Sequence, residues 1–199
     1  MIDHSKADHM PLLTPNFFER SVREVAPDLI GCYVFTTIDN VRVGGMIIET
    51  EAYREEDPFA HCFFNSEIPR LKGSDPMLGS PGSLYFYFSG QLPCLNLVCE
   101  HKDVGSAVLI RALLPTCNID AMFARRASWY NKTRKPIPKY LEDVTKRGRN
   151  LCNGPAVLSE ALGIDDESKI GLSIFDPPFE IRQAVCTENL NPKDGRDEP

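Results

Sequence analysis

The stretch from Gly45 to Tyr53 limits the possible folds most strongly, because an apolar run passes into acidic residues without a turn residue between them. Such a run predicts a β-strand, in which side chains alternate between two faces. The set expected on one face is Ile47, Glu49, Glu51 and Tyr53. Because a buried carboxylate without a partner is unfavourable, two interpretations remain open. The glutamates are solvated at a strand end, or one of them activates water beside an aromatic ring that stacks on a planar substrate.

Local patterns predict the other elements. A helix is expected to begin at Thr14 and Pro15, because threonine suits the N-cap and proline the first helical position, and to end at Pro27. The turn-like pair Asp39 and Asn40 lies between two strand patterns and predicts a hairpin. Strands are expected over residues 29–37, 41–51, 83–88, 94–99, 106–114 and 169–175, and further helices over residues 118–130 and 156–162.

Residues 54–82 show no regular pattern and are rich in proline and glycine. Loops of this length inside a compact domain are usually functional or disordered. This segment also carries His61, Arg70 and Lys72, which is an unusual mixture for a linker. We therefore expect a loop that contributes to a functional site.

Length and composition narrow the class of protein. The chain has 199 residues, enough for one domain with a substantial core, and no apolar run approaches the length of a membrane helix. The N-terminus is polar and lacks the apolar centre of a signal peptide. The 7 cysteines include no C-x-x-C pair, which argues against a disulfide framework or a zinc finger. We expect an intracellular protein, cytoplasmic if bacterial and nuclear if eukaryotic.

The charge is distributed unevenly along the chain. The formal net charge of -6 argues against a polyanionic partner, but residues 125–149 are strongly basic and only Glu142 and Asp143 oppose them. A local basic surface binds phosphates whatever the total charge of the molecule. A solvated basic loop explains the cluster about as well.

Arg111 interrupts the apolar pattern of residues 106–114. An arginine in this position is either a buried cation with a carboxylate partner or an edge residue. The lack of polar neighbours favours the buried cation. A cation near Glu51 would keep that carboxylate ionised.

The familiar catalytic motifs are absent from this chain. We find no Walker loop, no G-x-G-x-x-G after a strand and no H-E-x-x-H. The spacing of His61 and the cysteines makes no convincing metal site, so we predict neither a metal nor a cofactor. The remaining candidates are Glu49 or Glu51, Tyr53, His61, Tyr85, Tyr87, Asn96 and Arg111. This set suits a planar heterocycle held between aromatic rings while a carboxylate aligns water.

Several short segments occur in a recognisable order. They are Ile48-Glu49-Thr50-Glu51-Ala52-Tyr53, Ala60-His61, Pro81-Gly82-Ser83-Leu84-Tyr85-Phe86-Tyr87, Cys94-Leu95-Asn96, Val108-Leu109-Ile110-Arg111-Ala112-Leu113 and Leu151-Cys152-Asn153-Gly154-Pro155. This order resembles that of the alkyladenine (3-methyladenine) DNA glycosylase family, over most of residues 13–175. The T-E-A-Y and G-[ST]-L-Y-x-Y elements are specific when they occur together.

The resemblance, taken with the predicted elements, implies an α+β fold. We expect a single domain with a mostly antiparallel curved sheet, peripheral helices and a long active-site loop. Residues 1–12 are expected to be a disordered tail, residues 13–188 the glycosylase-like domain and residues 189–199 a loose C-terminal tail.

The resemblance also implies a monofunctional base-excision enzyme. It would extrude an alkylated purine of the 3-methyladenine or 7-methylguanine type, hydrolyse the N-glycosidic bond and leave an abasic site. By position, Glu51 would activate water and Arg111 would orient it. The residues implied to bind the base are Tyr53, His61, Tyr85, Tyr87 and Asn96, and those implied to contact DNA are Arg70, Lys72, Leu92, Arg147 and Arg149. The expected partner is DNA that contains damaged purines, bound by a monomer.

One motif of the family differs in this chain. The family continues after its second tyrosine as Y-x-Y-x-x-Y-G-M, and the third tyrosine wedges into the duplex. No aromatic wedge follows Tyr87 at that position here, so Leu92 is expected to act as an apolar plug. Two alternatives stay open as a result: a catalytically weak or inactive relative that binds damaged DNA, and a hydrolase that prefers single strands or nucleosides.

Overall fold

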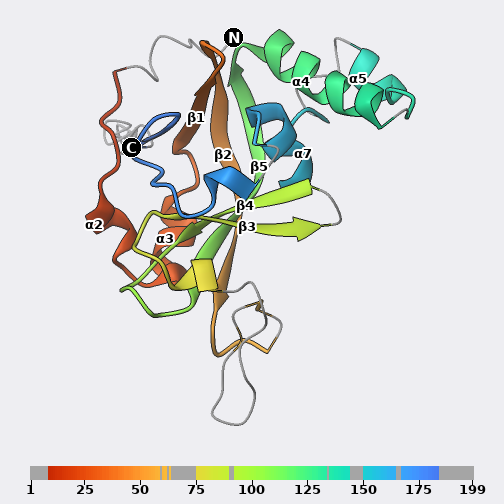
Figure 1. Cartoon of the computed structure of the whole chain (residues 1–199). Coiled ribbons are helices and arrows are strands. Elements are labelled where there is room, and N and C mark those ends of the chain that lie inside the picture. The colour runs from red at the N-terminus through yellow and green to blue at the C-terminus, as the bar shows by residue number, and fades with distance from the viewer. Residues whose placement is uncertain are drawn as a thin grey trace, which may run out of the picture.

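The computed structural model describes residues 9–58, 60, 61, 63, 75–89, 92–133, 135–143, 150–164 and 167–183. In this part of the chain, six strands form one antiparallel sheet in the order β3-β4-β5-β2-β1-β6 (Figure 1). The strands are β1 (Tyr33–Ile38), β2 (Val41–Arg54), β3 (Leu84–Ser89), β4 (Leu92–Val98), β5 (Ser106–Cys117) and β6 (Phe179–Arg182). In Figure 1, β3 and β4 run across the direction of β1, β2 and β5, so the sheet curls. The predicted α+β domain with a curved antiparallel sheet is confirmed.

The hairpin between β1 and β2 is confirmed. Asp39 and Asn40 both adopt positive φ, at 54° and 58°, as a two-residue hairpin turn of right-handed twist requires. Strand β2 continues to Arg54, three residues beyond the predicted end. Strand β1 begins only at Tyr33, because Gly31 turns the chain with a φ of 88°.

Pro115 does not end β5, contrary to the prediction. The strand runs on to Cys117, and Pro115 pairs with Gly45 beside a register shift between Gly44 and Gly45. Proline is tolerated in a sheet at such irregularities, because no ladder hydrogen bond is lost there. A Cβ atom at Gly45 would lie 2.3 Å from the Leu114 carbonyl oxygen, so the two strands approach closely only because this residue is glycine.

Two short helices replace the single helix predicted after Thr14. They are α2 (Pro15–Phe18) and α3 (Val22–Asp28), and Ser21 caps the second through a hydrogen bond from the Arg23 amide. Thr14 makes no side-chain cap bond. Pro27 lies in the last turn of α3, one residue before its end.

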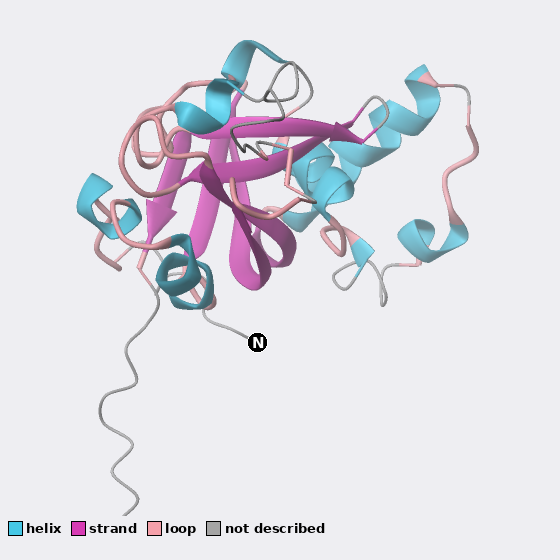
Figure 2. Cartoon of the chain, turned by 90° about the horizontal axis from the view of Figure 1, so that it is seen from below, coloured by secondary structure: helices cyan, strands magenta, loops and turns pink. Residues whose placement is uncertain are grey.

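The other helices of the described residues are α4 (Ile119–Lys132), α5 (Lys139–Glu142), α7 (Pro155–Leu162) and the 3-10 turns η1 (Asp75–Leu78) and η2 (Glu167–Lys169). The predicted end of α7 at Gly163 is confirmed, with a φ of 78°. Figure 1 and Figure 2 show α2 and α3 toward one end of the sheet and α4 and α5 toward the other. In the described residues, no helix is both long and apolar enough to span a bilayer.

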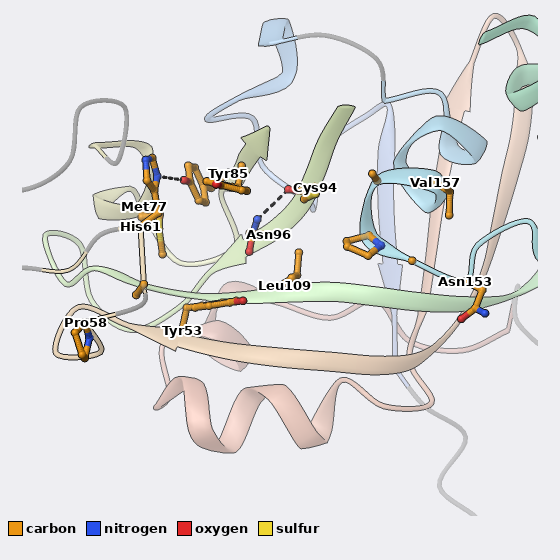
Figure 3. A pocket seen from close by; sticks show the side chains of 15 residues that line it. Tyr53, Pro58, His61, Met77, Tyr85, Cys94, Asn96, Leu109, Asn153 and Val157 are labelled. Carbon is orange, nitrogen blue, oxygen red and sulfur yellow. Dashed lines mark hydrogen bonds between the residues drawn. The ribbon is translucent and has the colours of Figure 1, made fainter. Parts of the chain in front are cut away.

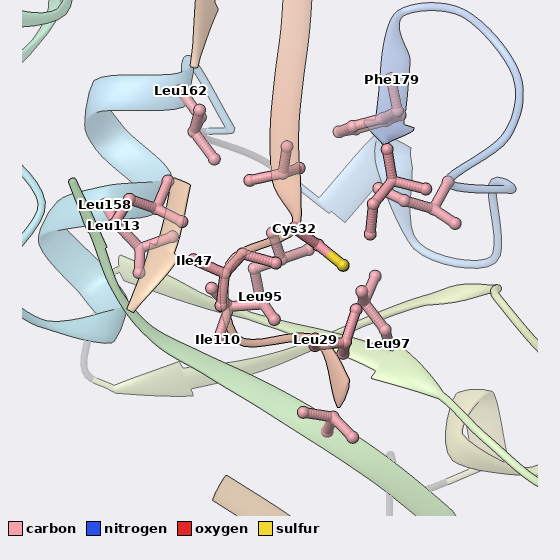
Figure 4. Packing of buried hydrophobic residues seen from close by; sticks show 14 of the residues in the cluster. Leu29, Cys32, Ile47, Leu95, Leu97, Ile110, Leu113, Leu158, Leu162 and Phe179 are labelled. Atoms are coloured by element: carbon pink, nitrogen blue, oxygen red, sulfur yellow. The ribbon is translucent and has the colours of Figure 1, made fainter. Parts of the chain in front are cut away.

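The main core lies between the inner face of the sheet and the helices α3, α4 and α7 (Figure 4). Ile47, Leu97 and Ile110 enter it from three strands, and Leu158 enters it from α7; all four are fully buried. Burial of one such side chain contributes about 1.5–3 kcal/mol. This packing fixes the position of α7 against β4 and β5.

Two further expectations are wrong in part, and one strand was not expected. Residues 169–175 form the end of η2 and turns rather than a strand, because Gly171 adopts a φ of 79° and only an isolated bridge joins Ser173 to Ser83. Strand β6 was not predicted. Residues at the end of the expected N-terminal tail are packed: Met10 is 7% exposed and Leu12 forms a bridge to Arg182.

The proposed DNA contacts Arg70, Lys72, Arg147 and Arg149 lie outside the described residues, as do residues 1–8 and 189–199 of the expected tails and residues 184–188 of the expected domain.

Candidate active site

A row of paired residues crosses four strands of the sheet. Glu51 of β2 pairs with Leu109 of β5, Leu109 pairs with Asn96 of β4, and Asn96 pairs with Tyr85 of β3. Directly paired residues in antiparallel strands project from the same face of a sheet. The register therefore brings a carboxylate, an amide and a phenol, which are far apart in the sequence, onto one surface.

Two shifts in the pairing of β2 with β5 orient the charged residues. The register passes from Ile47–Leu113 to Glu49–Ala112 and then to Thr50–Ile110. Ile48 and Arg111 therefore have no residue paired opposite them in the neighbouring strand. Such bulges re-aim side chains and are common beside active sites. They explain why Ile47 is fully buried while Glu49 lies on the exposed face, although the simple alternation placed both on one side.

Glu51 is held by two hydrogen bonds. The Tyr53 hydroxyl donates to Glu51 Oε1 at 2.8 Å, and Arg111 Nη1 donates to Glu51 Oε2 at 2.6 Å. Arg111 Nε also donates to Glu49 Oε1 at 3.1 Å. The predicted carboxylate partner of Arg111 is thus confirmed, but its predicted burial is wrong, because the side chain is 39% exposed.

These contacts fix the protonation of the two donors. Burial, followed by the hydrogen bond to Glu51, raises the pKa of Tyr53 to about 12. The hydrogen bond to Glu51 is also the largest cause that raises the pKa of Arg111. Tyr53 therefore remains a neutral donor and Arg111 a cation at neutral pH.

A cavity of about 660 Å³ opens beside this cluster (Figure 3). Its lining residues are Tyr53, Pro58, Ala60, His61, Met77, Tyr85, Tyr87, Cys94, Asn96, Leu109, Asn153, Gly154, Pro155, Ala156 and Val157. Figure 3 shows Tyr53 and Leu109 on one wall, Tyr85 and Asn96 facing them, and Val157 at the far end. The structure thus brings all five predicted base-binding residues into one cavity.

Aromatic rings dominate one end of the cavity. The ring centroids of His61 and Tyr87 lie 5.3 Å apart in an edge-to-face contact, and Nδ1 of His61 shares a hydrogen bond with the Tyr85 hydroxyl. Tyr85 is 2% exposed, whereas Tyr87 is 50% exposed. An aromatic face that is half uncovered at a cavity wall offers a stacking surface to a planar ligand. Burial lowers the pKa of His61, which favours the neutral imidazole.

Asn96 lies at the centre of the cavity wall and is 4% exposed. Its Nδ2 donates to the Cys94 carbonyl at 2.9 Å, which fixes the orientation of the amide. A fixed amide in an otherwise apolar region suits the recognition of heteroatoms on a ring.

The sequence did not predict the part of the cavity wall that the start of α7 and the turn η1 form. Residues 153–157, at the start of α7, and Met77 of η1 line the cavity, and neither was proposed as part of the site. The Asn-Gly-Pro motif before α7 was recognised only as a family signature. Leu109 was also missed, although it lies two residues before Arg111 on the same strand.

Leu92 is the first residue of β4 and pairs with Ser89 across the β3–β4 hairpin. It does not line the cavity, and its proposed role as a plug stays a prediction. Among the described residues, no three His, Cys, Asp or Glu side chains are grouped so as to hold a metal ion.

Two basic residues of the 125–149 cluster are not part of a charged surface. Arg126 is fully buried, and its Nε lies 3.5 Å from Glu160 Oε2. Arg125 donates to the main-chain carbonyls of Leu162, Ile38 and Val41. Both arginines therefore join α4 to the rest of the domain, which the basic pattern alone did not indicate.

The chain is similar to known proteins along most of its length. Residues 16–195 match the model of the methylpurine-DNA glycosylase (MPG) family. A curated relative from Rhodopseudomonas palustris (strain HaA2) is 42% identical over 176 residues, which cover 88% of this chain and 75% of that protein. One from Bradyrhizobium diazoefficiens is 46% identical over 175 residues, which cover 87% and 74%.

Both relatives carry the name "Putative 3-methyladenine DNA glycosylase". The match covers nearly the whole domain and includes every residue of the Glu51 cluster and the cavity. The chain belongs to the methylpurine-DNA glycosylase family, a family of DNA glycosylases and hence of hydrolases.

Proposed function

We propose that this protein is a base-excision repair glycosylase that flips alkylated purines out of DNA and hydrolyses their N-glycosidic bond with water activated by Glu51. One observation carries the proposal. The Glu51 carboxylate is hydrogen-bonded to Tyr53, whose ring lines an aromatic cavity of about 660 Å³. That volume lies within the range of about 300–1,000 Å³ typical of small-molecule sites.

The aromatic end of the cavity accounts for the choice of base. A purine methylated at N3 or N7 carries a positive charge, and cations are attracted to aromatic faces. Tyr53 and Tyr87 would stack on the flipped base, with His61 at its edge. Asn96 would accept or reject purine substituents through its fixed amide.

Glu51 is suited to align and deprotonate water. Each oxygen of an ionised carboxylate has two acceptor positions, and the bonds from Tyr53 and Arg111 use one on each oxygen. A further position on each oxygen remains for a water molecule. As the water oxygen forms its bond to C1′ of the sugar, its proton passes to Glu51. The glycosidic electron pair leaves with the base and neutralises the positive charge of the alkylated purine, so no general acid is required.

DNA binding would use groups outside the cavity. We assign phosphate contacts to Arg70, Lys72, Arg147 and Arg149, because a glycosylase must hold the backbone in register while the base is extruded. Leu92 would fill the gap left in the duplex, as apolar side chains do between base steps.

The leucine plug predicts an unusual substrate preference. A mismatched or single-stranded lesion should react faster than the same lesion in a fully paired duplex, because extrusion costs a few kcal/mol less there and Leu92 offers less stacking than an aromatic wedge. The measurement is the single-turnover rate of base release from three oligonucleotides that carry one lesion in each context.

Leu92→Tyr provides the matched variant for this prediction. An aromatic side chain at the same position should raise the rate on the paired duplex and leave the single-stranded rate unchanged. A strong preference of the wild-type protein for fully paired duplex would show that Leu92 is not a weak plug.

The experiment that tests the proposed function is the release of free methylated purines from alkylated DNA. The wild-type protein should release 3-methyladenine or 7-methylguanine and leave unbroken strands with abasic sites. Binding of alkylated DNA without release would identify a damaged-DNA-binding relative instead. Hydrolysis of free nucleosides, with no release from DNA, would identify a nucleoside hydrolase.

A further inference from the structure

Glu49 lies beside the proposed catalytic carboxylate but has no part in the proposed attack of water. Arg111 donates to Glu49 Oε1 through Nε at 3.1 Å and to Glu51 Oε2 through Nη1 at 2.6 Å. One guanidinium therefore joins two carboxylates that lie two residues apart on β2.

The two hydrogen bonds together fix the guanidinium. The group is planar and its donors have a fixed geometry, so a bond at Nε in addition to one at Nη1 sets its orientation as well as its position. With the Glu51 bond alone, the Arg111 side chain, which is 39% exposed, could rotate toward solvent or toward a nearby phosphate. The Glu49 bond opposes this rotation.

Glu49 is a poor candidate for either stability or DNA binding. Its side chain is 55% exposed, and ion pairs this exposed contribute little to folding. A second negative charge near Glu51 also repels a phosphate backbone. A benefit of Glu49 must therefore lie outside folding stability and DNA binding.

We infer that Glu49 is a positioning residue: it orients Arg111 and thereby sets the direction from which Arg111 holds Glu51. This inference rests on the proposed function, because it assigns Glu49 a part in base release. Glu49 itself would touch neither the base nor the water.

Glu49→Ala tests the inference. The single-turnover rate of base release at saturating enzyme should fall by about 10-fold or more, since small misplacements of catalytic groups cost that much. The dissociation constant for the same DNA should stay equal or decrease, because a negative charge is removed. Glu49→Gln keeps an oxygen that can accept from Nε, so its rate should lie closer to that of the wild type.

Two comparisons separate positioning from other effects. In an Arg111→Ala background, Glu49→Ala should cause no further loss of rate, because the residue through which it acts is gone. Asp28→Asn is the matched control. It removes the carboxylate of the Arg20–Asp28 pair, whose exposures of 37% and 52% resemble those of the Arg111–Glu49 pair, 39% and 55%. Its rate should equal that of the wild type.

Three results would overturn the inference: a Glu49→Ala rate equal to that of the wild type, a loss of rate in Glu49→Gln equal to that in Glu49→Ala, or an undiminished loss in the Arg111→Ala background.

Failure of the proposed function gives a different result from failure of the inference about Glu49. If the wild-type protein itself releases no base from alkylated DNA, the function is wrong. If the wild type is active and Glu51→Gln is inactive, only the role of Glu49 is in question.

Discussion

Replacing Arg126 with alanine is expected to lower the free energy of unfolding at pH 7 by about 3–5 kcal/mol, because the Glu160 carboxylate is left buried without a cation. The side chains of Arg126 and Glu160 are only 1% and 5% exposed. Arg126 Nη1 also donates to the carbonyls of Asn150 and Leu151, at 2.8 and 3.3 Å. Urea unfolding of the wild type and the variant measures the loss.

The stability deficit of Arg126→Ala, which is its free energy of unfolding subtracted from that of the wild type, should shrink as the pH falls. Burial raises the pKa of Glu160 from its ordinary 4.5 to about 6, although Arg126 lowers it. Without Arg126 that pKa rises further. Between about 6 and that higher pKa, the folded variant binds a proton that neither the folded wild type nor the unfolded chain binds, so the deficit shrinks as the pH decreases. From about 6 down to 4.5, both proteins gain stability in parallel. A deficit that is equal at pH values near 5 and 7 would contradict this account.

The double variant Arg126→Met, Glu160→Leu separates burial of charge from loss of packing. Apolar residues of similar size often replace a buried ion pair without loss of stability, so the double variant should unfold close to the wild type. If it is as unstable as Arg126→Ala, the carbonyl contacts at residues 150 and 151 matter more than the charge. Those contacts lie just before the segment that forms the far wall of the cavity.

The sequence predicted much of the site because its residues lie in recognisable local patterns. Glu51 and Tyr53 alternate on one strand, and their hydrogen bond follows from that spacing. Tyr85 and Tyr87 share a face of β3 for the same reason, and both line the cavity. The hairpin at Asp39 and Asn40 depended on residue types that tolerate positive φ.

The remaining features depend on contacts between distant segments. The register shifts at Ile48 and Arg111 arise from the fit of β2 to β5, so they cannot be read from either strand alone. These shifts exposed Arg111 and gave it Glu49 as a second partner. Arg126 lies in a basic stretch typical of a solvated surface, and only the packing of α4 against α7 shows that it is buried with Glu160.

Replacing Glu51 with glutamine is expected to reduce base release by about 10²–10⁴-fold, the usual contribution of a general base. The amide has nearly the same shape as the carboxylate but cannot take a proton from water. We expect the affinity for DNA to stay the same, because the proposed stacking residues Tyr53 and Tyr87 and the other lining residues of the cavity are all retained. An interaction needed only in the transition state affects the rate and not the affinity.

Arg111→Lys is a useful comparison for Glu51→Gln. Lysine retains a positive charge near Glu51 but cannot bond two carboxylates with a planar fork. Its rate should therefore lie between those of the wild type and Glu51→Gln, with an unchanged unfolding curve. A full loss of folding in either variant would mean that the Glu51–Arg111 pair is structural.

The most direct measurement compares single-turnover release of one methylated purine from a defined oligonucleotide by the wild type and by Glu51→Gln, together with the dissociation constant of each protein for that DNA. We predict rapid release by the wild type, no more than about one hundredth of that rate for the variant, and equal affinities. Release by Glu51→Gln at the wild-type rate, or parallel loss of rate and affinity, would contradict the assignment of Glu51 as the group that activates water.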